Sequence, residues 1–175
     1  AVDSSKVYAA LLLHFGRGMA FANTGRIHEA EAESGMVQRL VKDTVLSLPF
    51  TPFSPAIDGA VIAGNMLAGS IALAKKNYAE AISRFQTAVE RENKMVYNEP
   101  RDWLLNPKYY LADAYFRAGK WKEAEAVFNN DLKDNNENIW SLNGLHKTLQ
   151  QQGKNEAAAK VAARMELAAR DSDVF

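Results

Sequence analysis

Histidine is the side chain most often used for metal binding and for proton transfer near neutral pH, and the chain has three of them. No two of His14, His28 and His146 have the i, i+4 spacing that places two imidazoles on one face of a helix. His14 and His146 also fall on packing positions of the helices expected below. We therefore expect structural histidines and no metal site. Metal binding by histidine with Asp or Glu from a neighbouring segment stays open as an alternative.

The residue types needed for nucleophilic catalysis do not occur in a recognisable arrangement. The chain has no Gly-x-Ser-x-Gly turn to hold a strained serine and no glycine-rich loop to bind phosphate. Cysteine is absent, which excludes disulfides, thiolate metal ligands and cysteine nucleophiles. Glu99 and Asp102 could form a carboxylate pair, but we expect them to pair with Arg101 or to cap the following helix. The sequence thus predicts no catalytic residue, no cofactor and no enzymatic activity.

Charge and hydropathy bear on the class of partner. The chain has 21 basic and 21 acidic side chains and a formal net charge of zero. Proteins that bind nucleic acid or anionic membranes need a basic excess, so we expect no nucleic-acid partner and no anionic membrane as the main partner. No apolar run approaches the roughly 20 residues needed to cross a bilayer, so we expect no membrane span. The chain begins at Ala1 without an initiator Met. We interpret it as a fragment rather than a processed protein, because its first expected helix is apolar on both faces.

One short pattern recurs through the chain. The segment 116–128, FRAGKWKEAEAVF, combines a helix end, a glycine turn and a helix start, and degraded copies occupy 21–32, 73–85 and 149–161. The copies share a turn position, at Gly25, Lys76, Gly119 and Gly153, and a small residue five positions later, at Ala30, Ala81, Ala124 and Ala158. Subtracting the turn positions gives spacings of 51, 43 and 34 residues, which we interpret as a 34-residue period with two insertions.

At this spacing the chain resembles the tetratricopeptide repeat family. The best unit has large apolar, small, aromatic and glycine residues on the family's positions, namely Leu111, Ala112, Tyr115, Gly119, Trp121, Ala124 and Phe128. The small residues let two antiparallel helices approach closely, and the aromatic residues fill the space beside them. The resemblance implies an all-α fold, a right-handed α-solenoid of about four antiparallel helix pairs (about eight helices) that forms a single array over 1–175.

The expected repeats cover 4–46, 55–92, 105–136 and 137–170, with connectors at 47–54 and 93–106. We expect the second helix of the first repeat to run from about Arg26 to Leu46. The first connector holds three of the five prolines together with Phe50 and Phe53, so we expect it to pack against the array rather than act as a binding lid.

Two dipeptides, Ser54-Pro55 and Asn106-Pro107, have the N-cap and first-turn chemistry of helix starts. The helix after Ser54 carries Gly59, Gly64 and Gly69, which predicts close packing around it, because glycine costs about 1 kcal/mol relative to alanine inside a helix.

The segment from Tyr97 to Lys154 resembles something narrower, the closing part of larger bacterial tetratricopeptide proteins, in which an Asn/Asp-Glu-Pro-Pro-x-Trp loop precedes the last two repeats. Here Arg101 replaces the second proline, and Leu104 and Leu105 replace the usual aromatic residues. Many of those proteins look exported, so the resemblance implies a periplasmic or external location, with the cytoplasm as the alternative. Most of them have no assigned activity.

The family resemblance also implies a concave groove lined by the first helix of each pair. Carried over residue by residue, the groove positions of the last two repeats are Asn106, Tyr109, Asp113, Phe116, Arg117, Trp140, Asn143, Lys147, Gln150 and Gln151. Those of the first two repeats are Phe15, Met19, Asn23, Met66 and Ser70. Phe15 and Met19 stand where family members that clamp a chaperone tail have Lys and Asn, so we expect no such clamp.

The predicted function is a non-catalytic protein–protein interaction or scaffold module, which binds a peptide, a partner protein or another segment of a longer polypeptide in this groove. The second connector adds a dense set of aromatic and charged candidates, Tyr97, Glu99, Arg101, Asp102 and Trp103. The alternative is a structural subunit that packs within an oligomer or complex. A less favoured alternative is an enzyme, small-ligand or metal-binding domain, with a pocket between the Phe50 and Phe53 connector and the Trp103 loop.

Overall fold

The computed structural model describes residues 4–48, 54–99 and 101–170, and within these ranges the chain forms eight α-helices and one short 3-10 helix. It divides into two compact units, Ala1–Pro107 and Lys108–Phe175. The first unit holds α1 (Ser4–Asn23), α2 (Ile27–Leu40), η1 (Thr44–Ser47), α3 (Ala56–Ala74) and α4 (Tyr78–Glu92). The second holds α5 (Pro107–Arg117), which begins at the boundary, α6 (Trp121–Asp134), α7 (Ile139–Gln151) and α8 (Asn155–Arg170). The predicted all-α, eight-helix repeat fold is confirmed.

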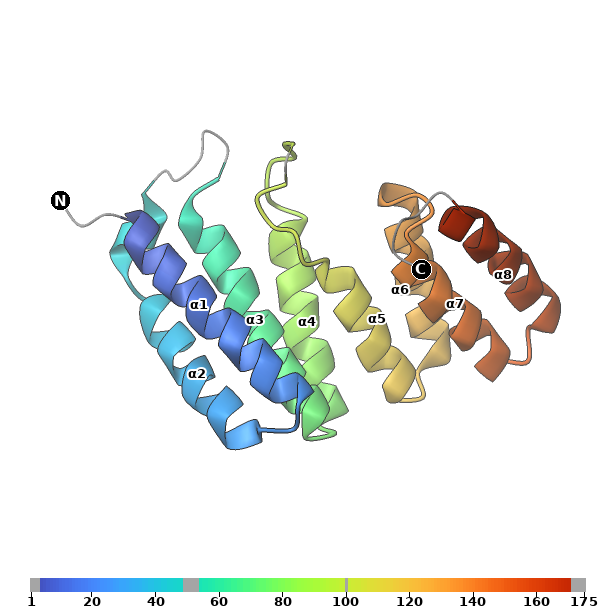
Figure 1. Ribbon diagram of the computed structural model, residues 1–175, viewed down its shortest axis with the longest axis horizontal. Coiled ribbons are helices and arrows are strands. Elements are labelled where there is room, and N and C mark those ends of the chain that lie inside the picture. Colours follow the sequence, from blue (N-terminus) through green and yellow to red (C-terminus); the bar gives the residue numbers. More distant parts are fainter. Residues whose placement is uncertain (1–3, 49–53, 100, 171–175) are drawn as a thin grey trace. The chain divides into compact units, whose positions relative to one another are not determined.

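In the first unit α3 is the central helix, with α1, α2 and α4 packed against it (Figure 1). Its small residues allow close approach. A Cβ atom added to Gly69 would lie 2.7 Å from the ring of Phe85 on α4, and one added to Gly59 would lie 2.0 Å from the hydroxyl of Tyr8 on α1. The predicted close packing is therefore confirmed at Gly59 and Gly69, whereas Gly64 has only ordinary contacts, the nearest at 3.7 Å.

By length and composition α3 also passes the test for a membrane-spanning helix, so the prediction that no apolar segment is long enough to cross a bilayer is wrong. Ala56–Ala74 has 19 residues and a mean hydropathy of 1.5. Gly, Ser and Asn residues break the strictly apolar run of this helix, but Asp58 is its only charged residue, so its mean hydropathy stays high. In the structure 61% of this apolar stretch is buried inside the protein, as in the core helix of a helical bundle.

The four turns that define the repeat have the same backbone. Gly25, Gly119 and Gly153 have φ of 76°, 73° and 71°, and Lys76 has φ of 59°, so all four turn positions are left-handed. The residue after each turn position donates its backbone N–H to the carbonyl five residues earlier, at 2.8–2.9 Å. This is the Schellman arrangement, which satisfies the free carbonyl groups at a helix end. The predicted turn positions are confirmed.

Two predicted helix limits are wrong. We expected the helix that starts near Arg26 to run to Leu46, but α2 ends at Leu40 and the 3-10 helix η1 follows. The Asp43 side chain accepts a hydrogen bond from the Val45 N–H at 3.0 Å, which caps η1, and Leu46 is fully buried. Because η1 packs against α1 and α3, tertiary contacts override the helical periodicity here.

The second wrong limit is the start of α3. Ser54 was expected to be the N-cap, but the N-cap is Pro55, with extended ψ of 152° and no side-chain cap hydrogen bond, so the helix begins at Ala56. The residues Phe50 and Phe53 of the same connector lie outside the described residues.

The second unit has one hydrophobic core, to which all four of its helices contribute. The buried members are Ala112, Ala124, Phe128, Leu132, Leu142, Leu145, Leu149, Ala158 and Val161. The repeated small residues Ala124 and Ala158 are 0% and 3% exposed, which places them where the helices approach most closely. Lys108 on α5 pairs with Asp134 on α6, and both residues belong to this unit.

Candidate functional site

A pocket of about 300 Å³ opens in the second unit between α5, α6 and α7. We call it the second-unit pocket. Its lining consists of Tyr109, Asp113, Phe116, Arg117, Phe128, Asn143, Gly144 and Lys147. Residues four apart on a helix share a face, so α5 contributes Tyr109, Asp113 and Arg117 in one row and α7 contributes Asn143 and Lys147 in another. The two rows face the same space.

The inner part of the pocket is aromatic. Phe128 is 2% exposed, and its ring lies 6.3 Å from the ring of Tyr109 between centroids, at 58°. The ring reaches this place because residue 144 is glycine: a Cβ atom there would lie 2.2 Å from the Phe128 ring. Any larger residue at 144 would force the ring to move. The pocket thus depends on a small residue of α7 and a large one of α6.

The outer part of the pocket is polar and carries both signs of charge. Arg117 Nε donates to Asp113 Oδ2 at 2.8 Å, one helical turn away, and Lys147 is exposed on the opposite helix. Burial raises the pKa of the Tyr109 hydroxyl, and the negative charge of Asp113 raises it further, while Arg117 opposes the shift. Tyr109 therefore stays neutral near pH 7 and can donate or accept a hydrogen bond.

Six of the ten groove residues predicted for the last two repeats line this pocket together: Tyr109, Asp113, Phe116, Arg117, Asn143 and Lys147. The other four are not among the lining residues. Gln150 and Gln151 are exposed at the end of α7, and Asn106 belongs to the first unit. Trp140, at the start of α7, is 58% exposed.

The groove residues predicted for the first two repeats are mostly inaccessible. Phe15 is 5% exposed, Met19 8%, Met66 0% and Ser70 7%, so the prediction that they present an apolar groove to a partner is wrong. Only Asn23 is exposed. These side chains belong to the core, because a helical spacing identifies an apolar face without showing what already covers it.

The second connector folds on itself. Tyr97 donates a hydrogen bond to Glu99, and the Arg101 guanidinium lies 5.7 Å from the centre of the Tyr97 ring. Asn98 Nδ2 donates to Asp102 Oδ1 at 3.2 Å. Glu99 and Asp102 thus each accept a hydrogen bond from a residue of the same connector.

Trp103 is the buried residue of this connector. It is 7% exposed, its ring lies 5.5 Å from that of Phe15, and its Nε1 donates to the Leu105 carbonyl at 2.6 Å. It therefore holds the connector to the first unit and presents little surface to a partner.

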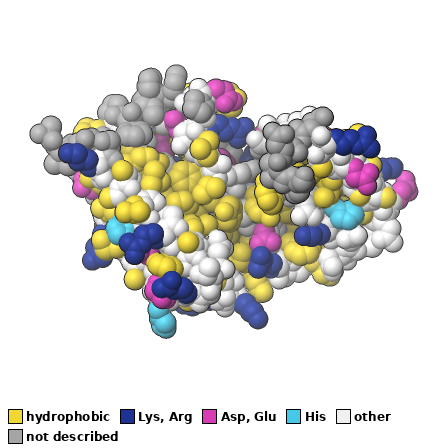
Figure 2. Space-filling view, viewed as in Figure 1, with side chains coloured by type: hydrophobic (Ala, Val, Ile, Leu, Met, Phe, Trp, Pro, Cys, Tyr) yellow, Lys and Arg dark blue, Asp and Glu magenta, His cyan; other side chains and the backbone are white. Residues whose placement is uncertain are grey.

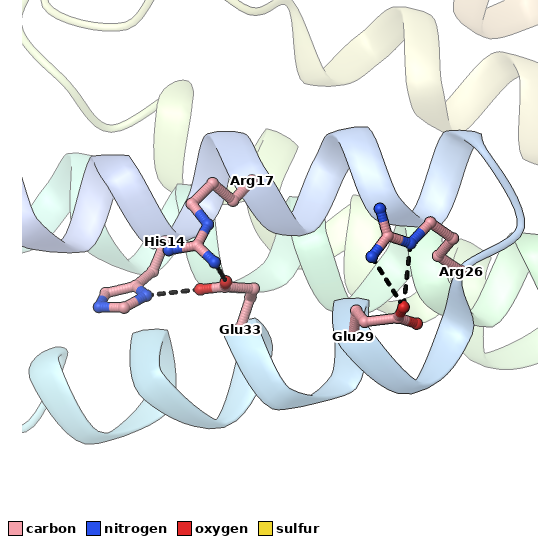
Figure 3. Close-up of polar contacts among 5 residues, drawn as sticks. All are labelled: His14, Arg17, Arg26, Glu29 and Glu33. Atoms are coloured by element: carbon pink, nitrogen blue, oxygen red, sulfur yellow. Dashed lines mark hydrogen bonds and ion pairs between the residues drawn. The ribbon is translucent and has the colours of Figure 1, made fainter.

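The three histidines lie apart and have different surroundings. His14 on α1 contacts Glu33 on α2, with 2.5 Å between Nδ1 and Oε2 (Figure 3). His28 is exposed and lies 4.0 Å from Glu31. His146 Nδ1 lies 3.0 Å from the Ala158 carbonyl, between α7 and α8. Among the described residues, no group of three or more His, Asp or Glu is arranged to hold a metal ion.

Two buried carboxylates were not singled out from the sequence. Glu33, with a side chain 9% exposed, also accepts from Arg17 at 2.9 Å. Asp131 is fully buried and accepts from Ser141, Asn135 and Asn138. The sequence did indicate their burial, because each carboxylate lies on the apolar face of its helix. Glu33 follows the buried Ala30 by three residues, and Asp131 follows the buried Phe128 by three.

Comparison with known proteins agrees with this architecture. Residues 61–130 match the tetratricopeptide repeat family. A crystal structure of nearly identical TPR-like repeats of a kinesin light chain from Podosopora anserina superposes with a TM-score of 0.51 and 12% identity, over 100% of both chains. A crystal structure of a substituted form of the same repeats gives a TM-score of 0.49 and 12% identity over 96% of this chain and 97% of that one. No curated protein matches the chain significantly.

The family match concerns the repeated sequence pattern, and the structural similarity concerns the fold. The family match covers most of the second predicted repeat (55–92) and most of the third (105–136), including the turns at Lys76 and Gly119. The first kinesin light chain structure shares the helical-repeat fold at an identity too low to say anything of partners. Taken with the four matching turns and the buried small residues, the comparisons show a helical-repeat fold in which residues 61–130 match the tetratricopeptide repeat family.

Proposed function

We propose that the chain is a non-catalytic protein–protein interaction module whose second-unit pocket binds a peptide segment of a partner protein. Tetratricopeptide repeats generally mediate protein–protein interactions through the first helices of their pairs. The observation that carries the proposal is the convergence of α5 and α7 on one pocket with an aromatic interior and a polar rim.

The chemistry of the pocket suits a peptide better than a small apolar ligand. The interior offers the Phe128 and Phe116 rings to one apolar side chain, while the Asn143 amide can donate to and accept from a peptide backbone. The rim charges of Lys147 and the Asp113–Arg117 pair would select among peptides by their charges. A volume of about 300 Å³ accommodates one or two side chains of such a segment.

A peptide-display experiment tests the proposal without a known partner. A random peptide library is selected on the full chain, and the affinity of the selected peptides is then measured on variants Tyr109→Ala, Asn143→Ala and Lys147→Ala. We expect each substitution to weaken binding by about tenfold or more, as residues at the centre of an interface do. Lys122→Ala is the matched control, because Lys122 is exposed on α6 and does not line the pocket.

Two outcomes contradict the proposal. One is a set of selected peptides whose affinity is the same for the three pocket variants and for Lys122→Ala. The other is failure to select any peptide on a chain whose circular dichroism shows it to be folded. Circular dichroism of each variant separates loss of binding from loss of structure.

A further inference from the structure

Another pocket, of about 290 Å³, lies within the first unit between α2, α3 and α4. We call it the α2–α4 pocket. Among the described helices, α2 and α4 each pack on α3 and not on each other. Residues of α3 therefore form the floor of the pocket, and residues of α2 and α4 form its two walls.

Ser34 on α2 brings to this pocket a hydroxyl group that the protein does not use. The residue is 7% exposed, and among the described residues its hydroxyl has no hydrogen-bond partner. By contrast, the hydroxyl of the fully buried Thr148 donates to the Gly144 carbonyl, four residues earlier, at 2.7 Å. Because a buried hydroxyl is favourable only when something bonds to it, Ser34 is available to a ligand in the pocket.

Gly35, the next residue of α2, keeps space free in the pocket. A Cβ atom added to Gly18 would lie 2.7 Å from the Leu67 side chain, so that glycine is needed for close helix packing. A Cβ atom added to Gly35 would meet nothing within 4 Å. Glycine is unfavourable inside a helix compared with alanine, and at this position no close contact compensates for it. Its effect is to leave open a volume that a side chain would fill.

The walls carry two acidic and two basic side chains, which form two pairs. Glu31 accepts from Lys75 at 3.0 Å, and Glu80 lies 3.7 Å from Arg84, so the four charges cancel. A bound anion would lie close to both carboxylates, and a bound cation close to both basic groups, so the pocket favours a ligand without net charge. It differs from the face over α1, where Figure 2 shows mainly apolar side chains.

The hydrogen-bonding groups of the pocket indicate what kind of neutral ligand it takes. Its basic side chains can only donate and its carboxylates can only accept, whereas the Ser34 hydroxyl does both. A ligand hydroxyl also does both, so a molecule with several adjacent hydroxyl groups can bond to all of these groups without breaking either ion pair. Ile71 and Ala72, which are 7% and 3% exposed, give the floor an apolar surface for the carbon skeleton of such a molecule.

We propose that the α2–α4 pocket binds a small neutral molecule with several hydroxyl groups, of the size of a monosaccharide, through Ser34 and the paired charges of its walls. A volume of about 290 Å³ is at the lower end of the range for small-ligand sites, which limits the ligand to this size. The pocket belongs to the first unit and the second-unit pocket to the other, so neither proposal depends on the other.

The probes are three neutral sugars, glucose, galactose and mannose, and two charged counterparts of glucose, glucuronate and glucosamine. Each is titrated into the isotope-labelled full chain, and binding is followed by the chemical shifts of the backbone amides. Ser34→Ala removes the hydroxyl, and Gly35→Leu fills the free volume. Gly16→Leu is the matched control, because Gly16 on α1 is also an open helical glycine but does not line the pocket.

We expect at least one neutral sugar to shift the amide signals of residues around the pocket. Ser34→Ala should weaken its affinity by about threefold or more, Gly35→Leu should abolish binding, and Gly16→Leu should bind like the natural chain. Glucuronate and glucosamine should bind more weakly than glucose, because each brings a charge that the pocket repels.

The proposal is overturned if no neutral sugar shifts these signals, or if a charged counterpart binds as tightly as glucose does. Unchanged affinity in Ser34→Ala or in Gly35→Leu overturns it as well. The dispersion of the amide signals shows whether each variant is folded. If Ser34→Ala does not fold, Gly35→Leu decides, since leucine favours the helix more than glycine does.

Discussion

The hydroxyl of Ser141 on α7 donates a hydrogen bond to the carboxylate of Asp131 on α6, with 2.5 Å between Oγ and Oδ2, and both residues are fully buried. Asn135 and Asn138 donate to the same carboxylate at 2.7 Å and 3.0 Å. A buried carboxylate is tolerated only when such donors replace water. This carboxylate therefore ties the end of α6 to the start of α7.

Replacing Asp131 with alanine should destabilise the second unit by about 2–3 kcal/mol, because the Ser141 hydroxyl loses its acceptor in a buried place. Urea unfolding followed by circular dichroism measures the loss. Asn130→Ala, at an exposed position of the same helix, should change the free energy of unfolding by less than about 0.5 kcal/mol. Equal effects of the two substitutions would show that the network contributes nothing.

Glu33 links α2 to α1 through His14 and Arg17, and its side chain is only 9% exposed (Figure 3). Glu33→Ala should cost about 1–3 kcal/mol, because two cationic or hydrogen-bonding partners lose their acceptor. Glu29 serves as the control: it pairs with Arg26 at 2.9 Å, but in an exposed position. Glu29→Ala should change thermal stability little, since exposed ion pairs contribute little. Equal melting temperatures for Glu33→Ala and Glu29→Ala would contradict the stabilising role of Glu33.

Glu125 makes the second unit sensitive to acid. Burial acts to raise the pKa of its carboxyl, but hydrogen bonds from Lys154 and Gln152 and the charge of Lys154 outweigh burial, so the pKa lies below its ordinary value of 4.5. A depressed pKa contributes stability that is present above pH 4.5 and is lost as the pH falls through the folded value. Glu125→Gln should lose less than about 1 kcal/mol at pH 7 and show a flatter decline of melting temperature below pH 4.5.

The matched substitution for Glu125 is Glu123→Gln, at an exposed position of α6. Its melting temperature should follow that of the natural chain across the whole pH range. A natural chain and a Glu125→Gln variant with parallel pH profiles would contradict the predicted role of the Lys154 and Gln152 contacts.

Lys76 is the one turn position of the four that lacks glycine, and its φ of 59° strains a side chain. Lys76→Gly should stabilise the first unit by up to about 1 kcal/mol, because glycine adopts this conformation without the steric cost of a Cβ atom. Gly119→Ala, at φ of 73°, should destabilise the second unit by about 1 kcal/mol.

The control for Lys76→Gly is Lys76→Ala, which removes the charge but keeps the Cβ atom. It should leave the urea midpoint close to that of the natural chain. A gain in stability from alanine as large as that from glycine would attribute the effect to the lysine side chain and not to the backbone.

The sequence by itself determined the four turns and the helix pairs around them. A Schellman turn depends on a few consecutive residues, and the small residues at Ala30, Ala81, Ala124 and Ala158 follow at a constant distance. Such features are local, so they can be recognised without knowing what lies beside them. The row of residues from Tyr109 to Arg117 was predictable for the same reason, because their spacing places them on one face of a helix.

Only the tertiary structure decided which faces remain open. The spacing of Phe15, Met19 and Met66 identifies an apolar face correctly, but burial of that face depends on residues far along the chain, such as Trp103 over Phe15. The early end of α2 has the same kind of cause, since η1 packs against α1 and α3. Periodicity reports which side of a helix avoids water, and long-range packing determines whether the chain itself or a partner covers that side.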